Sequence, residues 1–264
     1  MIAWPFCIPS PSPALSSTCN TFPRHYCLLK LPDIPIRQIA TRRAAGLLAL
    51  GLAAGMAVAL EQANQDAALH FARVHYGAPA VARVRNWFSL MLGAGQAGER
   101  EKLKQVNEFF NRIPNTSDQA QWGKSDYWAT PLELIGANGG DCEDFALAKY
   151  FTLRELGVAD ERLRLTYVRA YLPASKEMQS HMVLTYHPAP DAEPLVLDNL
   201  TNAIKPASER KDLAPTYSFN GAQLWASKLR GSGRLNEPAP ANLWSMLRAR
   251  LPADEHAPQT TGEK

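Results

Sequence analysis

The sequence predicts an α+β protein, with helices first and an antiparallel sheet after them. Three features support this fold class. Apolar residues recur at helical spacing between residues 61 and 113, a helical segment covers residues 142–156, and β-rich runs bounded by turn residues follow residue 160. We therefore expect the sheet to pack against the helix over residues 142–156.

The first helices are expected between Glu61 and Ile113. The apolar residues near the helical period are Val81, Val84, Trp87, Phe88, Leu90, Met91, Leu103, Val106, Phe109 and Phe110. The stretch GAGQAGERE, residues 93–101, indicates a turn between two helices. The segment Gln119–Gly140 is rich in aromatic residues, Gly and Asn, so we expect mostly loop with one short helix over Pro131–Ile135.

The next helix is expected from Cys142 to Leu156, and Gly157 is well placed to end it. Strands are expected after this helix, because the runs are β-rich and bounded by turn residues. They cover Leu163–Val168, Ser180–Tyr186 and Pro194–Asp198, with one or two more short strands within Thr216–Trp225.

The chain divides into three regions. Residues 1–60 are a leader with a signal peptide, residues 61–235 are the folded domain, and residues 236–264 are a Pro-rich, largely disordered C-terminal tail around a short helix-like piece, NLWSMLRARL. The hydrophobic content of 46% is typical of a globular protein.

The leader has the features of an export signal. Arg42 and Arg43 precede an uncharged run, AAGLLALGLAAGMAVA, which ends in small residues suited to cleavage. An uncleaved membrane anchor is the alternative, because the run is slightly long for a signal core, although it is slightly shorter than a spanning helix of ~20 residues. The Pro-rich stretch before the run is unusual for a signal peptide, so we expect translation to start near Arg37–Arg43.

The basic character of the chain lies in this leader. Residues 1–60 hold five Lys and Arg against one Asp, whereas the rest of the chain has 23 basic and 24 acidic residues. The distribution therefore gives no basic patch that indicates nucleic acid binding.

The cysteines are unevenly placed as well. Cys7, Cys19 and Cys27 precede the signal, so cleavage leaves Cys142 as the last cysteine of the exported chain. A lone thiol in an oxidising compartment forms no internal disulfide and is open to oxidation. This favours a catalytic role, with a buried inert thiol as the alternative.

The segment GGDCEDFALAKY places Cys142 at the start of a predicted helix, between Asp141, Glu143 and Asp144. A helix N-terminus stabilises a thiolate through its free N–H groups and its dipole. The acids have a plain role too, since they complement the dipole and Asp caps helices well. Three negative charges nevertheless raise the pKa of a neighbouring thiol, so we expect a hard cation with oxygen ligands, such as Ca²⁺, to offset them.

A nucleophilic thiol needs a base and a group that orients the base. His181 in SHMVLTY and Asp198 in LVLDNL lie on two predicted strands, and they meet Cys142 if these strands face its helix. His187 is the rival base, although it precedes Pro188 at a predicted strand end. Asp198 has the alternative role of a turn residue that accepts backbone N–H groups.

An oxyanion formed by attack on a carbonyl needs preorganised donors. The backbone N–H of Cys142 is one candidate. Gln121, Trp122 and Asn138 are candidates for the second donor, and the sequence does not choose among them.

Together these segments resemble the bacterial transglutaminase-like cysteine proteases, and most closely the periplasmic adhesin-releasing proteases of the LapG type. The matching segments, in matching order across most of Trp122–Trp225, are DCEDFALAKYFTLRELGV, RLRLTYVRAYLP, HMVLTYH, LVLDNL and PTYSFN. The resemblance implies a papain/transglutaminase-like core, with the nucleophile on a helix and its partners on strands.

The resemblance also implies the site residues. The catalytic triad it implies is Cys142, His181 and Asp198. The calcium ligands it implies are the acids that flank the nucleophile, Asp141, Glu143 and Asp144.

By the same resemblance, the protein is expected to be a periplasmic, calcium-dependent cysteine endopeptidase. It would cleave the N-terminal region of a large surface adhesin, release the adhesin and disperse biofilm. An inner-membrane cyclic-di-GMP receptor would control it, through exposed aromatic residues such as Trp122 or Trp128, with buried packing as the alternative for either Trp. The chain itself would bind no nucleotide. Two alternatives are transglutaminase- or amidase-type acyl transfer, and a catalytically silent calcium-dependent binding module.

Overall fold

The structure is a computed structural model that describes residues 62–173, 176–221, 224–226 and 241–251. The expected leader over residues 1–60 therefore lies outside the described residues, and so does its apolar run. Within the described part of the chain, no helix is long and apolar enough to cross a membrane.

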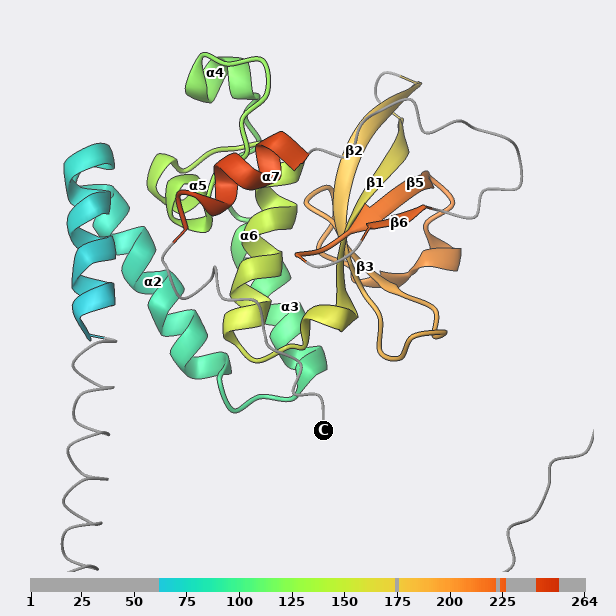
Figure 1. Ribbon diagram of the computed structural model, residues 1–264, viewed down its shortest axis with the longest axis horizontal. Coiled ribbons are helices and arrows are strands. Elements are labelled where there is room, and N and C mark those ends of the chain that lie inside the picture. Colours follow the sequence, from blue (N-terminus) through green and yellow to red (C-terminus); the bar gives the residue numbers. More distant parts are fainter. Residues whose placement is uncertain (1–61, 174–175, 222–223, 227–240, 252–264) are drawn as a thin grey trace, which may run out of the picture. The chain divides into compact units, whose positions relative to one another are not determined.

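The first half of the described chain is helical (Figure 1). After a helix over residues 62–76, the helices are α2 (Ala78–Ala94), α3 (Glu99–Phe110), α4 (Asp118–Trp122), α5 (Pro131–Ala137) and α6 (Cys142–Glu155). The helices α5 and α6 begin at the predicted residues, whereas α4 lies in a segment where the sequence predicts loop. A 3₁₀ turn, Asp160–Arg162, leads from α6 into the sheet.

An antiparallel sheet of six strands follows, in the order β4-β3-β2-β1-β5-β6. The strands are β1 (Leu163–Leu172), β2 (Glu177–Tyr186), β3 (Leu195–Leu197), β4 (Lys205–Pro206), β5 (Leu213–Phe219) and β6 (Leu224–Ala226). The α+β prediction of helices followed by an antiparallel sheet is confirmed. The very short β4, which contributes two residues, was not predicted.

The strand register brings distant parts of the sequence together. β1 and β2 form a long hairpin in which Val168 lies opposite His181. β3 pairs with only the last part of β2, where Leu197 lies opposite Leu184. Because the two strands are antiparallel, the chain that leaves β3 at Asp198 runs toward His181.

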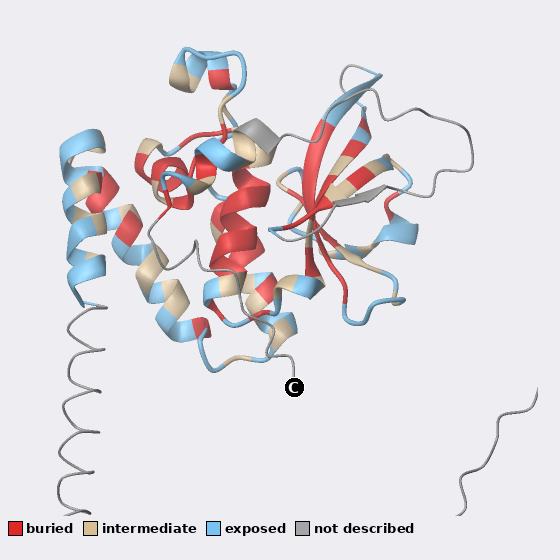
Figure 2. Cartoon of the chain, in the orientation of Figure 1, coloured by how far each residue is buried: buried red, intermediate tan, exposed pale blue. Residues whose placement is uncertain are grey.

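Helix α6 occupies the centre of the core. It packs against α3 and α5 among the helices, and against β2 and β1 of the sheet. All residues from Asp144 to Leu153 are buried, and Figure 2 shows this helix as an almost continuous buried segment. A helix buried on all sides has little freedom to move, so the sheet and the other helices fix where its first residue lies.

The short helix-like piece expected within the C-terminal tail is present as α7 (Ala241–Arg248). The sequence does not predict that this helix packs into the folded core. Its Leu247 is fully buried, and Trp244 stacks on Phe151 of α6 with ring centroids 5.9 Å apart. The apolar residues lie at helical spacing and give the short helix enough surface to bury, despite its polar surroundings.

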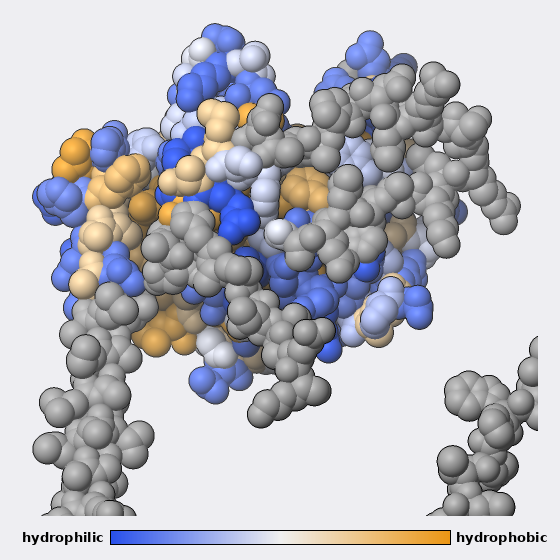
Figure 3. Space-filling model, viewed as in Figure 1, coloured by the Kyte–Doolittle hydropathy of each residue, from blue (hydrophilic) through white to orange (hydrophobic). Residues whose placement is uncertain are grey.

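The exposed surface is mixed in character. In the view of Figure 3, hydrophobic residues gather over the helices. Two large exposed side chains there are Val74, in the helix over residues 62–76, and Leu92 in α2. Scattered apolar residues of this kind are normal on a folded protein and do not define an interface.

Helix α6 also buries a lysine. Lys149 is 1% exposed, and its ammonium group makes no hydrogen bond to the described residues. Burial lowers the pKa of Lys149 to about 7, and the negative charge of Asp198 opposes this only in part. Because an unfolded lysine has a pKa of about 10.4, the buried side chain opposes folding most strongly below pH 7, and the penalty fades as the pH rises.

We expect Lys149→Met to raise the free energy of unfolding at pH 6 by about 1–3 kcal/mol, because methionine fills a similar volume without a charge. The gain should shrink between pH 7 and pH 10, where the wild-type lysine folds in its neutral form. Urea unfolding at pH 6 and pH 9.5 measures both effects. Lys104→Met, which removes an exposed charge from α3, is the control, and a Lys149→Met protein no more stable than wild type at pH 6 would contradict the penalty.

Candidate active site

Cys142 is the first residue of α6, and the residues around it hold the start of the helix in place. Asp144 Oδ2 accepts the backbone N–H of Asp141 at 3.4 Å, and Asp141 O accepts the N–H of Phe145. A Cβ atom at Gly140 would lie 2.5 Å from Asp144 Oδ2, so only glycine fits at this turn. The thiol therefore lies at a helix N-terminus, where unpaired N–H groups favour negative charge.

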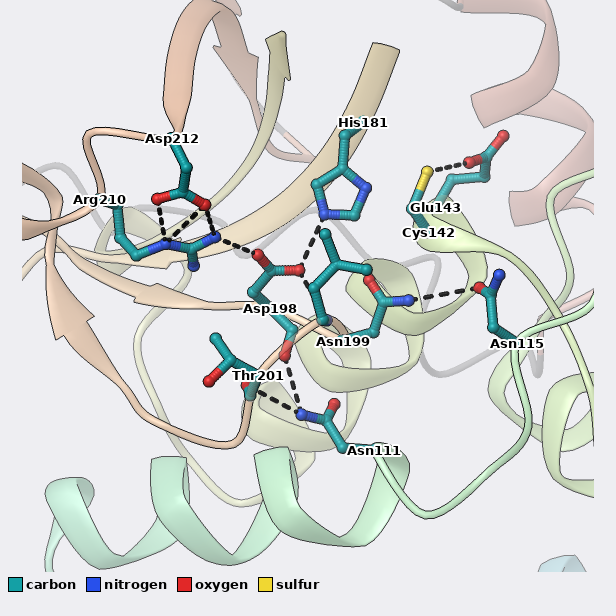
Figure 4. Close-up of polar contacts among 11 residues, drawn as sticks. Asn111, Asn115, Cys142, Glu143, His181, Asp198, Asn199, Thr201, Arg210 and Asp212 are labelled. Atoms are coloured by element: carbon teal, nitrogen blue, oxygen red, sulfur yellow. Dashed lines mark hydrogen bonds and ion pairs between the residues drawn. The ribbon is translucent and has the colours of Figure 1, made fainter. Parts of the chain in front are cut away.

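His181 and Asp198 form a buried pair beside this helix end. His181 Nε2 lies 2.8 Å from Asp198 Oδ1, and the two residues are 7% and 1% exposed. Figure 4 shows the imidazole between the Asp198 carboxylate and the Cys142 sulfur. An ionised carboxylate only accepts hydrogen bonds, so Nε2 carries the proton, and Nδ1 is the ring nitrogen left to act as a base.

Asp198 is held in its ionised form. Burial alone would raise its pKa, but hydrogen bonds from His181, from the backbone N–H of Leu200 and from Arg210 lower the pKa to about 2. The backbone of the same loop is held by Asn111 at the end of α3, whose side-chain amide donates to Asp198 O at 2.8 Å. Both the charge and the position of this carboxylate are thus determined by neighbouring elements.

The Cys142 thiol is protonated in this arrangement. It donates to Glu143 Oε2 at 2.9 Å rather than to His181. Burial raises the pKa of the thiol, and the negative charge of Glu143 and this hydrogen bond raise it further. A backbone hydrogen bond from Met182 opposes the shift only in part. Loss of the contact with Glu143 would therefore make the thiol easier to ionise.

Three acids gather beside the thiol. One oxygen from each of Asp118, Asp141 and Glu143 lies within 4.8 Å of the others. Asp118 Oδ1 and Asp141 Oδ1 are buried and have no hydrogen-bond partner. Burial and the charges of Glu143, Asp144 and Asp118 raise the pKa of Asp141 to about 9. Such a group of buried, unpaired acceptors fits a hard cation that takes oxygen ligands.

Two of the three predicted calcium ligands lie together in the structure, and the third lies apart from them. Asp141 and Glu143 belong to the acid group, whereas Asp144 lies outside it and is fully buried. Both Asp144 oxygens accept backbone N–H groups, from Ala129 at 2.7 Å and from Asp141. Its observed role is to hold the start of α6, which corresponds to the plain structural role that the sequence also offered.

Asp118 completes the acid group, and sequence reasoning missed it. It lies at the start of α4, where its Oδ2 accepts the backbone N–H of Tyr127 at 2.5 Å. Its approach to Asp141 and Glu143 depends on the path of the loop before α6, where Thr116 N–H donates to Gly140 O at 2.7 Å. Neither the residue spacing nor the helical pattern reveals such a contact.

The candidates for the second oxyanion donor lie on the loop side of the thiol. A Cβ atom at Gly139 would lie 2.8 Å from Gln121 Oε1, so this side chain packs against the turn before Cys142. The indole N–H of Trp122 is buried without a hydrogen-bond partner. Asn138 ends α5 in a left-handed conformation, with φ of 57°. The choice among the three stays open.

The rival base is placed elsewhere. His187 follows β2, and its Nε2 lies 3.3 Å from the hydroxyl of Thr185. Burial and the positive charge of Arg164 lower the pKa of His187 to about 4. The described contacts of His187 thus include no carboxylate, and His181 is the histidine that the fold brings to Asp198.

Comparison with known proteins identifies clear relatives. The family described as "Bacterial transglutaminase-like cysteine proteinase BTLCP" matches residues 93–224. Legionella pneumophila LapG is similar in structure, with a TM-score of 0.59 and 36% sequence identity, over 70% of this chain and 96% of that chain. The calcium-bound form of that protein has a TM-score of 0.58 and 38% sequence identity, and the match covers 70% of this chain and 98% of that chain. The EGTA-treated form has a TM-score of 0.59 and 36% sequence identity, and the match covers 70% of this chain and 96% of that chain. No curated protein sequence matches significantly.

We expect Asp144→Ala to lower the free energy of unfolding by about 2–4 kcal/mol in the presence of EDTA, because it leaves two backbone N–H groups without their acceptor. Asp144→Asn keeps one acceptor oxygen, so its free energy of unfolding should fall by less than that of Asp144→Ala. Urea unfolding measures the effect. Glu143→Ala, in the same turn, is the control, and equal losses in the two alanine variants would show that Asp144 has no special role at the helix start.

Proposed function

The chain belongs to the bacterial transglutaminase-like cysteine proteinases, and we propose that it is an endopeptidase whose triad is Cys142, His181 and Asp198. The observation that carries this proposal is the buried hydrogen bond between His181 and Asp198, beside the helix end that bears Cys142. This geometry supplies a nucleophile, a base and a group that orients the base.

In the first half of the proposed reaction, His181 Nδ1 takes the thiol proton and the Cys142 sulfur attacks the carbonyl carbon of the substrate peptide bond. The backbone N–H of Cys142 at the start of α6 donates to the oxyanion. The imidazolium then gives its proton to the leaving amine, and a thioester remains on Cys142. Asp198 stays ionised throughout and stabilises the imidazolium.

In the second half, His181 acts on water. Nδ1 accepts a proton from a water molecule as the oxygen attacks the thioester carbon, and the same proton returns to the sulfur as the acid product leaves. An amine in place of water would give an amide, which is the acyl-transfer alternative. The two outcomes differ in product mass, so one experiment separates them.

The proposed metal is Ca²⁺, held by Asp118, Asp141 and Glu143. The unpaired, buried oxygens of the two aspartates support this site. When bound, the ion would supply positive charge beside three carboxylates that otherwise disfavour a thiolate. A Glu143 carboxylate that held the cation would no longer compete with His181 for the thiol proton. The calcium-bound and EGTA-treated forms of the Legionella pneumophila relative support the choice of ion.

The biological role follows from the resemblance and is proposed on that basis. The substrate is the N-terminal region of a large surface adhesin, and cleavage releases the adhesin and disperses biofilm. The protein acts in the periplasm after export, under an inner-membrane cyclic-di-GMP receptor. The export-like run between Arg43 and Glu61 supports the location.

We expect the chain from Glu61 onward, with calcium, to cut an N-terminal fragment of a large adhesin from the same genome into two pieces, as measured by intact mass. Cys142→Ala should leave the fragment whole, and His181→Ala should lower the rate by at least about a thousandfold, since it removes the base. EGTA should abolish the wild-type reaction.

The matched control for the base is His187→Ala, which should cut at the wild-type rate. Added mass on a lysine acceptor without new fragments would replace the endopeptidase by acyl transfer. If the fragment stays whole with every protein, the adhesin is not the substrate. If Cys142→Ala cuts as fast as wild type, Cys142 is not the nucleophile.

Calcium is also expected to stabilise the fold, because it binds the folded chain only. At millimolar calcium the wild-type melting temperature should rise by about 5 °C, and Asp118→Asn should remove most of this rise. Differential scanning calorimetry with and without EGTA measures the shift. Asp191→Asn, an exposed acid in the loop between β2 and β3, is the control, and an Asp118→Asn protein that keeps the full shift would exclude Asp118 as a ligand.

A further inference from the structure

We propose that Arg210 is a positioning residue of the triad, which holds the Asp198 carboxylate so that Oδ1 faces His181. The inference rests on the proposed function, and it adds a fourth residue to the machinery around Cys142. Arg210 lies in the chain between the 3₁₀ turn Ala207–Glu209 and β5. Figure 4 shows it on the side of Asp198 away from the imidazole.

The contact between Arg210 and Asp198 is direct and buried. Arg210 Nη2 donates to Asp198 Oδ2 at 2.7 Å, and the two residues are 7% and 1% exposed. Asp198 Oδ1 is used differently, since it faces His181 Nε2 at 2.8 Å and accepts the N–H of Leu200 at 3.0 Å. Each carboxylate oxygen therefore has its own partners, and Arg210 is the described partner of Oδ2.

No other described group substitutes for Arg210 at this oxygen. Asn111 donates to the backbone carbonyls of Asp198 and Thr201, so it fixes the loop but not the carboxylate. Lys149 from α6 acts on Asp198 through its charge, without a hydrogen bond. Rotation of the carboxylate about its side-chain bond is thus restrained at Oδ2 by the guanidinium.

Arg210 is itself held by a second carboxylate. Its Nε donates to Asp212 Oδ1 at 2.9 Å, and its Nη2 donates to Asp212 Oδ2 at 2.6 Å. Such a two-point contact fixes the plane of the guanidinium as well as its charge. Asp212, Arg210, Asp198 and His181 therefore form one continuous chain of charge-assisted contacts that ends at the proposed base.

The chain of contacts has a consequence for the reaction. Without Arg210, Asp198 keeps one buried oxygen without a hydrogen-bond partner, which costs free energy. The carboxylate is then free to turn away from the imidazole. His181 would then lose its fixed tautomer and orientation, as happens when the third member of a triad is changed. Arg210 contacts Asp198 and not the thiol, so the loss should fall on kcat and leave KM almost unchanged.

The test uses the full chain with calcium and the adhesin fragment. Arg210→Ala should lower kcat by about 100-fold with KM within about threefold, and Arg210→Lys, which keeps the charge but not the fork, by about tenfold. Asp212→Asn should lower kcat by about threefold to tenfold, since Arg210 loses its anchor. Arg162→Ala is the matched control, because it breaks an arginine–carboxylate pair with Glu99 at the opposite end of β1.

Two readouts separate positioning from a general loss of structure. Free guanidinium, at a concentration on the order of 10–50 mM, should occupy the space left by the arginine side chain and raise kcat of Arg210→Ala at least about tenfold. It should not raise kcat of His181→Ala. In ¹⁵N-labelled protein, the His181 Nε2–H resonance bonded to Asp198 should be present in wild type and Arg162→Ala and lost in Arg210→Ala. This second readout needs no substrate.

The outcomes are distinct. If Arg210→Ala keeps kcat within about twofold of wild type and retains the His181 resonance, the inference is overturned. If Arg210→Ala does not fold, Arg210→Lys and Asp212→Asn still test the positioning role of Arg210. A wild-type kcat in both variants overturns the inference. If wild type does not cut the fragment, the proposed function fails on that substrate, while the His181 resonance still tests the role of Arg210.

Discussion

The burial of α6 on all sides is the constraint on which the rest of the site depends. The helix packs between α3 and α5 and the sheet, so its first residue has one place relative to β2. Cys142 lies at that point because Gly140 permits a tight turn and Asp144 accepts the backbone N–H groups of the turn. The position of the proposed nucleophile is therefore a property of the core rather than of a surface loop.

The same helix end creates a conflict of charge. Its N–H groups favour a thiolate, whereas Glu143 accepts the thiol proton and two further acids, Asp118 and Asp141, lie close by. Burial strengthens the repulsion among these acids. The aspartate oxygens lack hydrogen-bond partners and the pKa of the thiol is raised, and the proposed cation among the acids would relieve both.

Sequence reasoning could predict the parts of the site that have local signals. Cys142 stands at a helix start, and His181 and Asp198 lie in β-rich runs, so pattern made them candidates and the family resemblance chose them over His187 and over a turn role for Asp198. Asp118 and Arg210 have no such signals, because their contacts depend on the path of a loop and on a turn before β5. The helix α7 was expected as a short helix-like piece, but its packing into the core has no local signal, since its apolar face is short and its surroundings are rich in proline.

The pH dependence of alkylation at Cys142, with calcium present, tests the account most directly. Iodoacetamide is applied between pH 4 and pH 9, and the modified Cys142 peptide is quantified by mass spectrometry for wild type and His181→Ala. A thiolate paired with His181 predicts fast alkylation well below pH 8.5, the ordinary pKa of a free cysteine, and loss of this reactivity in His181→Ala. Identical profiles for the two proteins, each rising only above pH 8, would contradict the proposed pair.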